Sequence, residues 1–276
     1  MKKNFYKKPK ISKNTNLNSN ISKNSLLIRS MVISAMLLSL YIIFAYIGNQ
    51  FFRLAFLASF LNLDISLIFL IPLVFICSAR YWIFVGVVGG LANFLWQGTG
   101  GWVGSVYNVV LNLILLSFVH LLKFIFIDLA IKLRSKKTLR DKETIDYKFS
   151  NKDFSVRIFL ICLISFIFMI LINSLLNGLL FTPLYISQYS KEPPNFIEIQ
   201  KKPNVFIAYT LGITNYWVGI FALYSAFNAI KFGIVFSVVF PVLTLLLIKS
   251  NIVQNYFGQP KYVQKQNVSN EYINQD

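Results

Sequence analysis

The chain has 276 residues, of which 56% are hydrophobic and only 13% are charged, with a formal net charge of +17. The charged share is about half that of an ordinary soluble domain, which argues against a soluble globular protein. The basic residues flank apolar stretches, where they mark the cytoplasmic side of membrane proteins, so the charge does not indicate nucleic-acid binding.

Long uncharged stretches indicate transmembrane helices. No charged residue occurs between Tyr81 and Leu122, or between Ile158 and Ser190. A spanning helix needs roughly 20 apolar residues, so each stretch holds at least one span. We expect an all-α membrane protein with about six transmembrane helices. The expected spans are residues 30–48, 65–79, 81–96, 105–131 and 158–180, and a last one ending at Ile248.

Charged segments delimit the membrane domain. Residues 1–29 hold eight basic and no acidic residues, and are expected to form a disordered basic cytoplasmic tail. Residues 30–250 are expected to be the membrane domain, with residues 132–157, which hold nine basic and four acidic residues, as a cytoplasmic connector. Residues 251–276 form the expected cytoplasmic C-terminal tail. Six spans place both termini in the cytoplasm.

Glycine and proline mark the expected breaks between spans. Residues 97–104 read QGTGGWVG, and four glycines in eight residues predict that the chain turns there. Pro183 is expected to end the fifth span, and residues 182–215 to form a long outer loop. Residues 205–221 are uncharged and allow a seventh span, but their tyrosine and tryptophan residues favour an interfacial loop.

Lys231 is the most informative single residue. It has 28 uncharged residues before it and 17 after it. A charge at such a position is costly in lipid and usually faces a cavity or a partner. Asn228 lies three residues earlier, on the same helical face. The pair could present an amide and an ammonium to a polar ligand; the alternative is that Lys231 lies near the outer end of its span and reaches the interface.

Asparagine side chains and small residues form further patterns. Asn173 and Asn177 share one face near the outer end of the fifth span, and Asn108 and Asn112 do the same at the start of the fourth. Together with Lys231 they describe a polar pocket on the outer side. The small residues Ser225, Ala229, Gly233 and Ser237 recur every four positions, which favours close helix packing.

The sequence holds no motif for catalysis, metal binding or ATP hydrolysis. We expect no cofactor and no metal site, and we do not expect an enzyme. Asp64 and Asp128 are the acids near spans, and each lies at an edge, whereas a proton- or sodium-coupled carrier usually places a carboxylate deeper. The single histidine, His120, is expected to be a packed or bridging residue.

Four segments in order resemble the riboflavin-type S components of energy-coupling factor (ECF) transporters, which are the substrate-binding membrane subunits of those vitamin transporters. The resemblance covers roughly residues 30 to 250. The segments are FLNLDIS (60–66), GTGGWVGSVYN (98–108), NGLLFTPLY (177–185) and FNAIKFGIVFS (227–237). The chain departs from the family pattern at Leu67, Ile68 and Ser105, where the family often has acidic residues.

The resemblance implies a membrane subunit that binds a vitamin at its outer face; riboflavin is one candidate, and the sequence leaves the identity of the vitamin open. It implies a membrane T component and two cytoplasmic ATPases as partners, in a bacterial cell membrane. Ala35 and Ser39 are similar to the small-residue pattern with which the family docks the T component. The family's FN-x-x-K element matches Asn228 and Lys231. The expected substrate-binding residues are Asn228, Lys231, Asn177, Tyr185, Asn108 and Asp64.

The sequence leaves two alternatives to the S-component function. A self-contained secondary transporter or channel for a small polar solute would work without partner ATPases. A membrane enzyme is disfavoured, because the sequence shows no catalytic constellation.

Overall fold

The computed structural model describes residues 23–52, 62–96, 101–133, 149–190 and 193–249, and the regular secondary structure of these residues is helical. The prediction of an all-α chain is confirmed for this part. In lipid every backbone N–H and C=O must bond within the protein, and helices meet that demand segment by segment.

The first three helices are of unequal length. Helix α1 (Lys23–Phe51) begins before the expected position, Ser30. Helix α2 (Leu67–Ile76) and helix α3 (Ala79–Leu91) are short, and a 3₁₀ turn (Ala92–Trp96) follows α3. Most of α2 is buried, so this helix lies inside the bundle with little contact with lipid.

Helix α4 (Gly101–Lys123) begins inside the glycine-rich segment, four residues before the expected start at Ser105. Gly101 has a φ of +54°, a conformation that glycine adopts without strain, which accounts for a glycine at this turn. A π-helical turn (Phe124–Asp128) follows, and the helical segment continues to Leu133.

Pro183 does not end the fifth span, contrary to the prediction. Helix α6 (Asn151–Leu176) passes through a π-helical turn (Asn177–Phe181) into α7 (Thr182–Ser190), forming one helical segment. The Thr182 N–H bonds to the Asn177 carbonyl, five residues back. Because this wider turn changes the hydrogen-bond register just before Pro183, the missing N–H of the proline is tolerated.

The expected outer loop, residues 182–215, is largely helical. After α7 come the single turns α8 (Phe196–Ile199) and α9 (Pro203–Phe206) and a 3₁₀ turn (Ile207–Tyr209). Helix α10 (Tyr216–Thr244) begins where the Asn215 side chain accepts a hydrogen bond from the Val218 N–H, and it ends in a π-helical turn (Leu245–Lys249). Residues 205–221 therefore form no continuous span.

Four helical segments are long and apolar enough to cross a membrane: Leu27–Phe51, Gly101–Leu133, Asn151–Gln188 and Tyr216–Ile248. Helices α2 and α3 are shorter apolar helices. The chain is accordingly a helical membrane protein. At about 1.5 Å per residue, α2 and α3 each cover only part of a bilayer roughly 30 Å thick.

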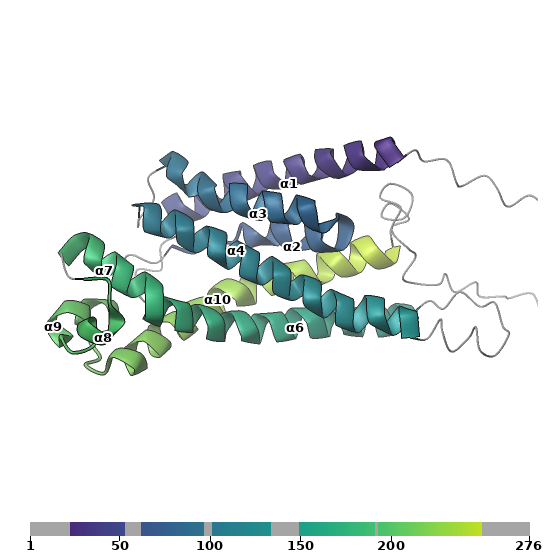
Figure 1. Cartoon of the computed structure of the whole chain (residues 1–276). Helices are drawn as coiled ribbons and strands as arrows, with labels where there is room; N and C mark the ends of the chain where they lie inside the picture. Colours follow the sequence, from purple (N-terminus) through teal and green to yellow (C-terminus); the bar gives the residue numbers. More distant parts are fainter. Residues whose placement is uncertain (1–22, 53–61, 97–100, 134–148, 191–192, 250–276) are drawn as a thin grey trace, which may run out of the picture.

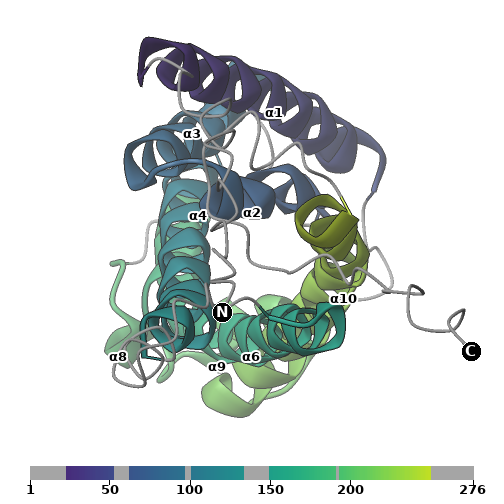
Figure 2. The ribbon, with the colours of Figure 1, turned by 90° about the vertical axis from the view of Figure 1, so that its right-hand side faces the viewer.

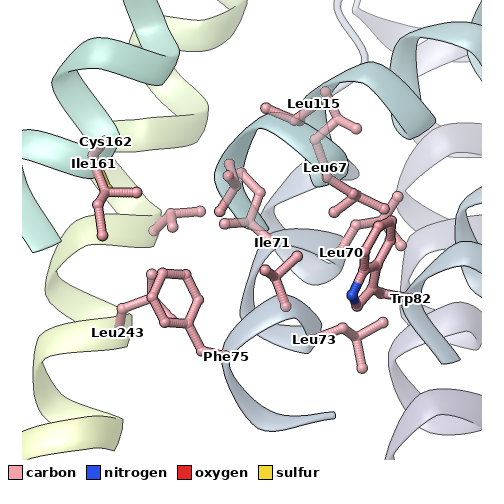
Figure 3. Packing of buried hydrophobic residues seen from close by; sticks show 14 of the residues in the cluster. Leu67, Leu70, Ile71, Leu73, Phe75, Trp82, Leu115, Ile161, Cys162 and Leu243 are labelled. Atoms are coloured by element: carbon pink, nitrogen blue, oxygen red, sulfur yellow. The ribbon is translucent and has the colours of Figure 1, made fainter. Parts of the chain in front are cut away.

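The helices pack around α2. Figure 2 shows α1 and α3 on one side of the bundle and α6 and α10 on the other, with α2 between them. Leu70 of α2 and Trp82 of α3 lie in the main core, together with Phe75 of α2 and Leu243 of α10 (Figure 3). A second apolar cluster joins the start of α10 to α7, α8 and α9, and includes Ile186, Ile199, Phe206 and Ile220.

The two ends of the bundle differ. Figure 1 shows the start of α1 and the end of α10 at one end, together with the end of the α4 segment and the start of α6. The small helices α7, α8 and α9 lie at the opposite end. We call this second group, residues 182–209, the cap.

Gly90 gives the first testable prediction, because α3 and α4 meet closely there. A Cβ at Gly90 would lie 2.6 Å from the Val109 backbone nitrogen. Backbone cannot move aside as a side chain does, so Gly90→Ala should lower the free energy of unfolding by about 1–3 kcal/mol. The measurement is denaturant unfolding of the purified protein in detergent.

Gly233→Ala is the matched control, since its Cβ would meet nothing closer than a Phe166 ring atom at 3.9 Å. Its unfolding free energy should stay within about 1 kcal/mol of the original. An equal loss of unfolding free energy in both variants would contradict the close approach of α3 and α4.

Candidate functional site

Asp64 precedes α2, and its Oδ1 accepts a hydrogen bond of 2.8 Å from the Ser66 N–H. Its backbone lies against α1 because Gly48 has no side chain: a Cβ there would lie 2.8 Å from the Leu63 oxygen and 3.2 Å from the Asp64 Cα. The Asp64 side chain is half-buried. Helix α2, which follows it, contacts α10, the helix that carries Lys231.

Lys231 lies near the middle of α10 and is only 3% exposed. A lysine that reaches the interface from a helix end keeps its ammonium group in water, which this position does not allow. Its Nζ lies 5.9 Å from the centre of the Phe232 ring. Within the described part of the chain, its ammonium group has no hydrogen-bond or ion-pair partner.

Two fully buried asparagines have side chains without hydrogen-bond partners. Asn228, one turn before Lys231, is 0% exposed, and neither its Nδ2 nor its Oδ1 has a partner. The same holds for both side-chain atoms of Asn173 on α6. A buried amide that forms no hydrogen bond costs free energy, and a native structure needs a reason for keeping it.

Tyr107 joins α4 to the π-helical turn at the end of α6. Its ring meets that of Phe181 edge to face, with ring centres 4.8 Å apart. Asn177, the first residue of this turn, is buried, and its Nδ2 donates to the Asn173 carbonyl oxygen at 2.8 Å.

Tyr41 joins α1 to α3 and α4 through Asn112. Asn112 Nδ2 donates to the Tyr41 hydroxyl oxygen at 3.1 Å and to the Gly86 carbonyl at 3.0 Å. Tyr41 and Asn112 are both buried, so these bonds tie α1, α3 and α4 together within the core. The amide oxygen of Asn112 has no partner.

The π-helical turn is anchored to α10. Pro183 has no N–H to continue the wider hydrogen-bond register, so the Gly178 carbonyl accepts a bond of 2.6 Å from the Tyr216 hydroxyl instead. The Tyr224 hydroxyl and the Thr182 Oγ1 lie 3.0 Å apart. A Cβ on Gly178 would lie 2.6 Å from the Trp217 ring, so glycine is required for this close packing.

Asn177, Asn228 and Lys231, three of the expected binding residues, are buried, and Asp64 is half-buried. Asn228 and Lys231 lie one turn apart on α10. Asn108 is half-buried on α4, next to Tyr107, and Tyr185 is half-buried on α7 within the cap. Ala35 and Ser39 lie on an exposed face of α1, and the Ser39 Oγ donates to the Ala35 carbonyl at 2.9 Å.

The small residues of α10 pack in part against α6. Ser225 Oγ lies 3.1 Å from Ser174 Oγ, and Gly233 faces Phe166. Internal packing is therefore their role at these two positions, as predicted. Ser237 is exposed.

A second polar group lies toward the other end of α4. Lys123 is buried and donates to the Val74 carbonyl of α2 at 3.1 Å. The ring of His120 lies 5.6 Å from that of Trp82, which agrees with a packed residue. The described residues contain no group of His, Cys, Asp and Glu side chains suited to a metal ion.

Tyr41 and Tyr107 were not expected from the sequence as site residues. An isolated tyrosine in an apolar helix is as compatible with the membrane interface as with a buried network. Asn112 gave the available signal for Tyr41, because its side chain bonds to the Tyr41 hydroxyl.

Two proteins of bacteria are similar to this chain. The uncharacterized protein MG350.1 homolog of Mycoplasma pneumoniae is 34% identical over 215 residues, which cover 76% of this chain and 84% of the relative. The uncharacterized protein MG350.1 of Mycoplasma genitalium is 29% identical over 219 residues, covering 75% and 82%. No protein-family model matches the chain, and no solved structure matches it.

The anchor of the π-helical turn gives a second prediction. Tyr216→Phe leaves the Gly178 carbonyl without its partner, so the free energy of unfolding should fall by about 1–3 kcal/mol. Tyr81→Phe is the control, because the structure shows no hydrogen bond of the Tyr81 hydroxyl to any described residue. Denaturant unfolding in detergent measures both, and equal stability of the two variants would contradict the anchor.

Proposed function

The chain belongs to the family of the Mycoplasma MG350.1 proteins, and we propose that it is a substrate-binding membrane subunit, the S component of an ECF-type ABC transporter. The proposed solute is a vitamin, and riboflavin is the first candidate. The proposed location is the bacterial cell membrane.

One observation carries the proposal. The fourth of the segments that resemble S components carries Asn228 and Lys231, which lie one turn apart on α10 and are both buried. The second and third segments, far apart in the sequence, meet where the rings of Tyr107 and Phe181 lie 4.8 Å apart. A resemblance arising from apolar composition alone gives no reason for an amide and an ammonium group to be buried side by side.

The unpaired groups at the site support a binding role. Asn228 and Lys231 lie one turn apart and are buried, and neither forms a hydrogen bond with a described residue. A polar ligand that bonds to both would offset the cost of burying them. This pairing of amide and ammonium is what the FN-x-x-K element of the family would use.

The proposed topology has six spans, with both termini and the connector, residues 132–157, on the cytoplasmic side. The four long segments account for four spans, and α2 and α3 for the remaining two. Short buried helices are compatible with this assignment when neighbouring helices surround them. The cap and the candidate site then lie toward the outer side.

The proposed partners are a T component and two cytoplasmic ATPases. The exposed face of α1 with Ala35 and Ser39 suits docking of another helix, because the Ser39 hydroxyl is already bonded to its own helix. A self-contained transporter or channel is the alternative. Uptake into vesicles that hold this protein alone would support the alternative and contradict the proposal.

Riboflavin binding tests the site directly. Asn228→Ala and Lys231→Ala should each weaken binding by at least about 1 kcal/mol, or roughly fivefold, because each leaves a ligand group unpaired. Quenching of riboflavin fluorescence by the purified protein gives the dissociation constants. Asn204→Ala and Lys201→Ala, which alter exposed residues of the cap, are the controls.

Unchanged binding by both site variants would reject these two residues as ligand contacts. If riboflavin does not bind to the original protein, riboflavin is rejected as the solute.

Cysteine labelling tests the topology. In a background where the buried Cys77 and Cys162 are replaced by alanine, a membrane-impermeant maleimide should label Lys201→Cys in intact cells. The maleimide should label Arg140→Cys only after the cells are permeabilised. Labelling of Arg140→Cys in intact cells would contradict the proposed orientation.

A further inference from the structure

We propose that Asn173 is a further solute-binding residue, which holds the solute from α6 while Asn228 and Lys231 hold it from α10. The inference rests on the proposed function, because it adds a contact to the same site. Asn173 lies four residues before Asn177, outside the four segments that carry the resemblance. The resemblance therefore assigns it no role.

The first observation is that the Asn173 side chain is buried and unpaired. It is 0% exposed, and neither its Oδ1 nor its Nδ2 has a hydrogen-bond partner among the described residues. The bond from Asn177 goes to the backbone carbonyl of Asn173, so it leaves the side-chain amide unused. Burying an unpaired amide costs stability, and a partner from outside the chain accounts for its presence.

The second observation is the level at which Asn173 and Asn228 lie. Helices α6 and α10 pack side by side and run in opposite directions (Figure 1). Ser174 Oγ lies 3.1 Å from Ser225 Oγ, which fixes their register. Asn173 is one residue before Ser174 and Asn228 three residues after Ser225, and both steps lead the same way along the bundle. At a rise of about 1.5 Å per residue, the two asparagines differ in level by about 3 Å.

The third observation is that both amides lie on the interior side of this helix pair. On α6, residues four positions apart are buried, namely Ser165, Met169 and Asn173. On α10, Asn228 and Lys231 belong to the buried face. Residues four positions apart share one face of a helix. Each helix therefore directs an unpaired amide into the same part of the bundle interior.

Two amides from two helices can hold one solute from two sides. Each offers an acceptor oxygen and an N–H donor. A small solute with polar groups on two edges bonds to both, and its binding then bridges α6 and α10. An ordered water that pairs the amides is the alternative occupant, because a polar site of this kind suits water as well.

The experiment replaces the amide by an apolar group of similar size, in the purified full-length protein with riboflavin as the probe. Asn173→Leu should weaken riboflavin binding about fivefold or more, because the solute loses a partner. The ligand-free variant should unfold at a temperature about 2 °C higher or more, because it no longer buries an unpaired amide. Fluorescence quenching and thermal unfolding in detergent give the two quantities.

Ser165→Ala is the matched control. The Ser165 Oγ is also buried without a partner among the described residues, on the same face of α6. It lies eight residues from Asn173, or about 12 Å along the helix. Its riboflavin affinity should stay that of the original protein. Asn173→Ala, which adds no bulk, repeats the test of affinity if leucine disturbs the packing.

Unchanged riboflavin affinity in Asn173→Leu and Asn173→Ala overturns this inference, and weakened binding by Asn228→Ala then leaves the proposed function standing. A lower unfolding temperature of ligand-free Asn173→Leu, together with unchanged affinity, assigns the amide to an ordered water and also overturns the inference. If riboflavin does not bind to the original protein, both the inference and the proposed solute are overturned.

Discussion

The burial of the Lys231 ammonium is the constraint on which the rest of the site depends. A charge in the middle of a membrane helix is expensive unless an opposite charge and hydrogen-bonding groups surround it. Here the ammonium lies on α10, which packs against α2, the buried helix that follows Asp64. Gly48 on α1 provides the space for the segment that leads into α2.

The π-helical turn before Pro183 serves the same site. It allows one helical segment to run from the bundle into the cap. The Gly178 carbonyl, which cannot bond to Pro183, accepts a hydrogen bond from the Tyr216 hydroxyl at the start of α10. The end of the α6 segment and the start of α10 are thereby joined, and the second apolar cluster packs the cap against them.

Much of the architecture could be predicted from the sequence, because hydropathy reports membrane helices directly. The uncharged runs predicted the four long segments, and the glycine-rich segment predicted the break before α4. The prediction that Pro183 ends the fifth span was wrong. A proline breaks an α-helix because it lacks the N–H that the regular hydrogen-bond pattern needs, and here a π-helical turn changes that pattern just before Pro183. The cap was predicted as a loop, because turns as short as α8 and α9 have no periodic pattern to detect.

The site was predictable in part. Lys231 and Asn228 stand out because polar groups in an apolar helix are rare, and both proved to be buried. Asp64 and Asn177 were expected from the resemblance, and Asn177 proved to be buried. Tyr41 was not predicted as a site residue, because its hydrogen-bond partner Asn112 lies 71 residues away in the chain and the contact depends on how the helices pack.

Native mass spectrometry of the gently purified protein, beside a Lys231→Met variant, tests the central claim most directly. The account predicts that the original protein retains a bound small molecule of vitamin size and that the folded variant does not. Retention of the same molecule by both proteins to the same extent would contradict the role given to the buried ammonium.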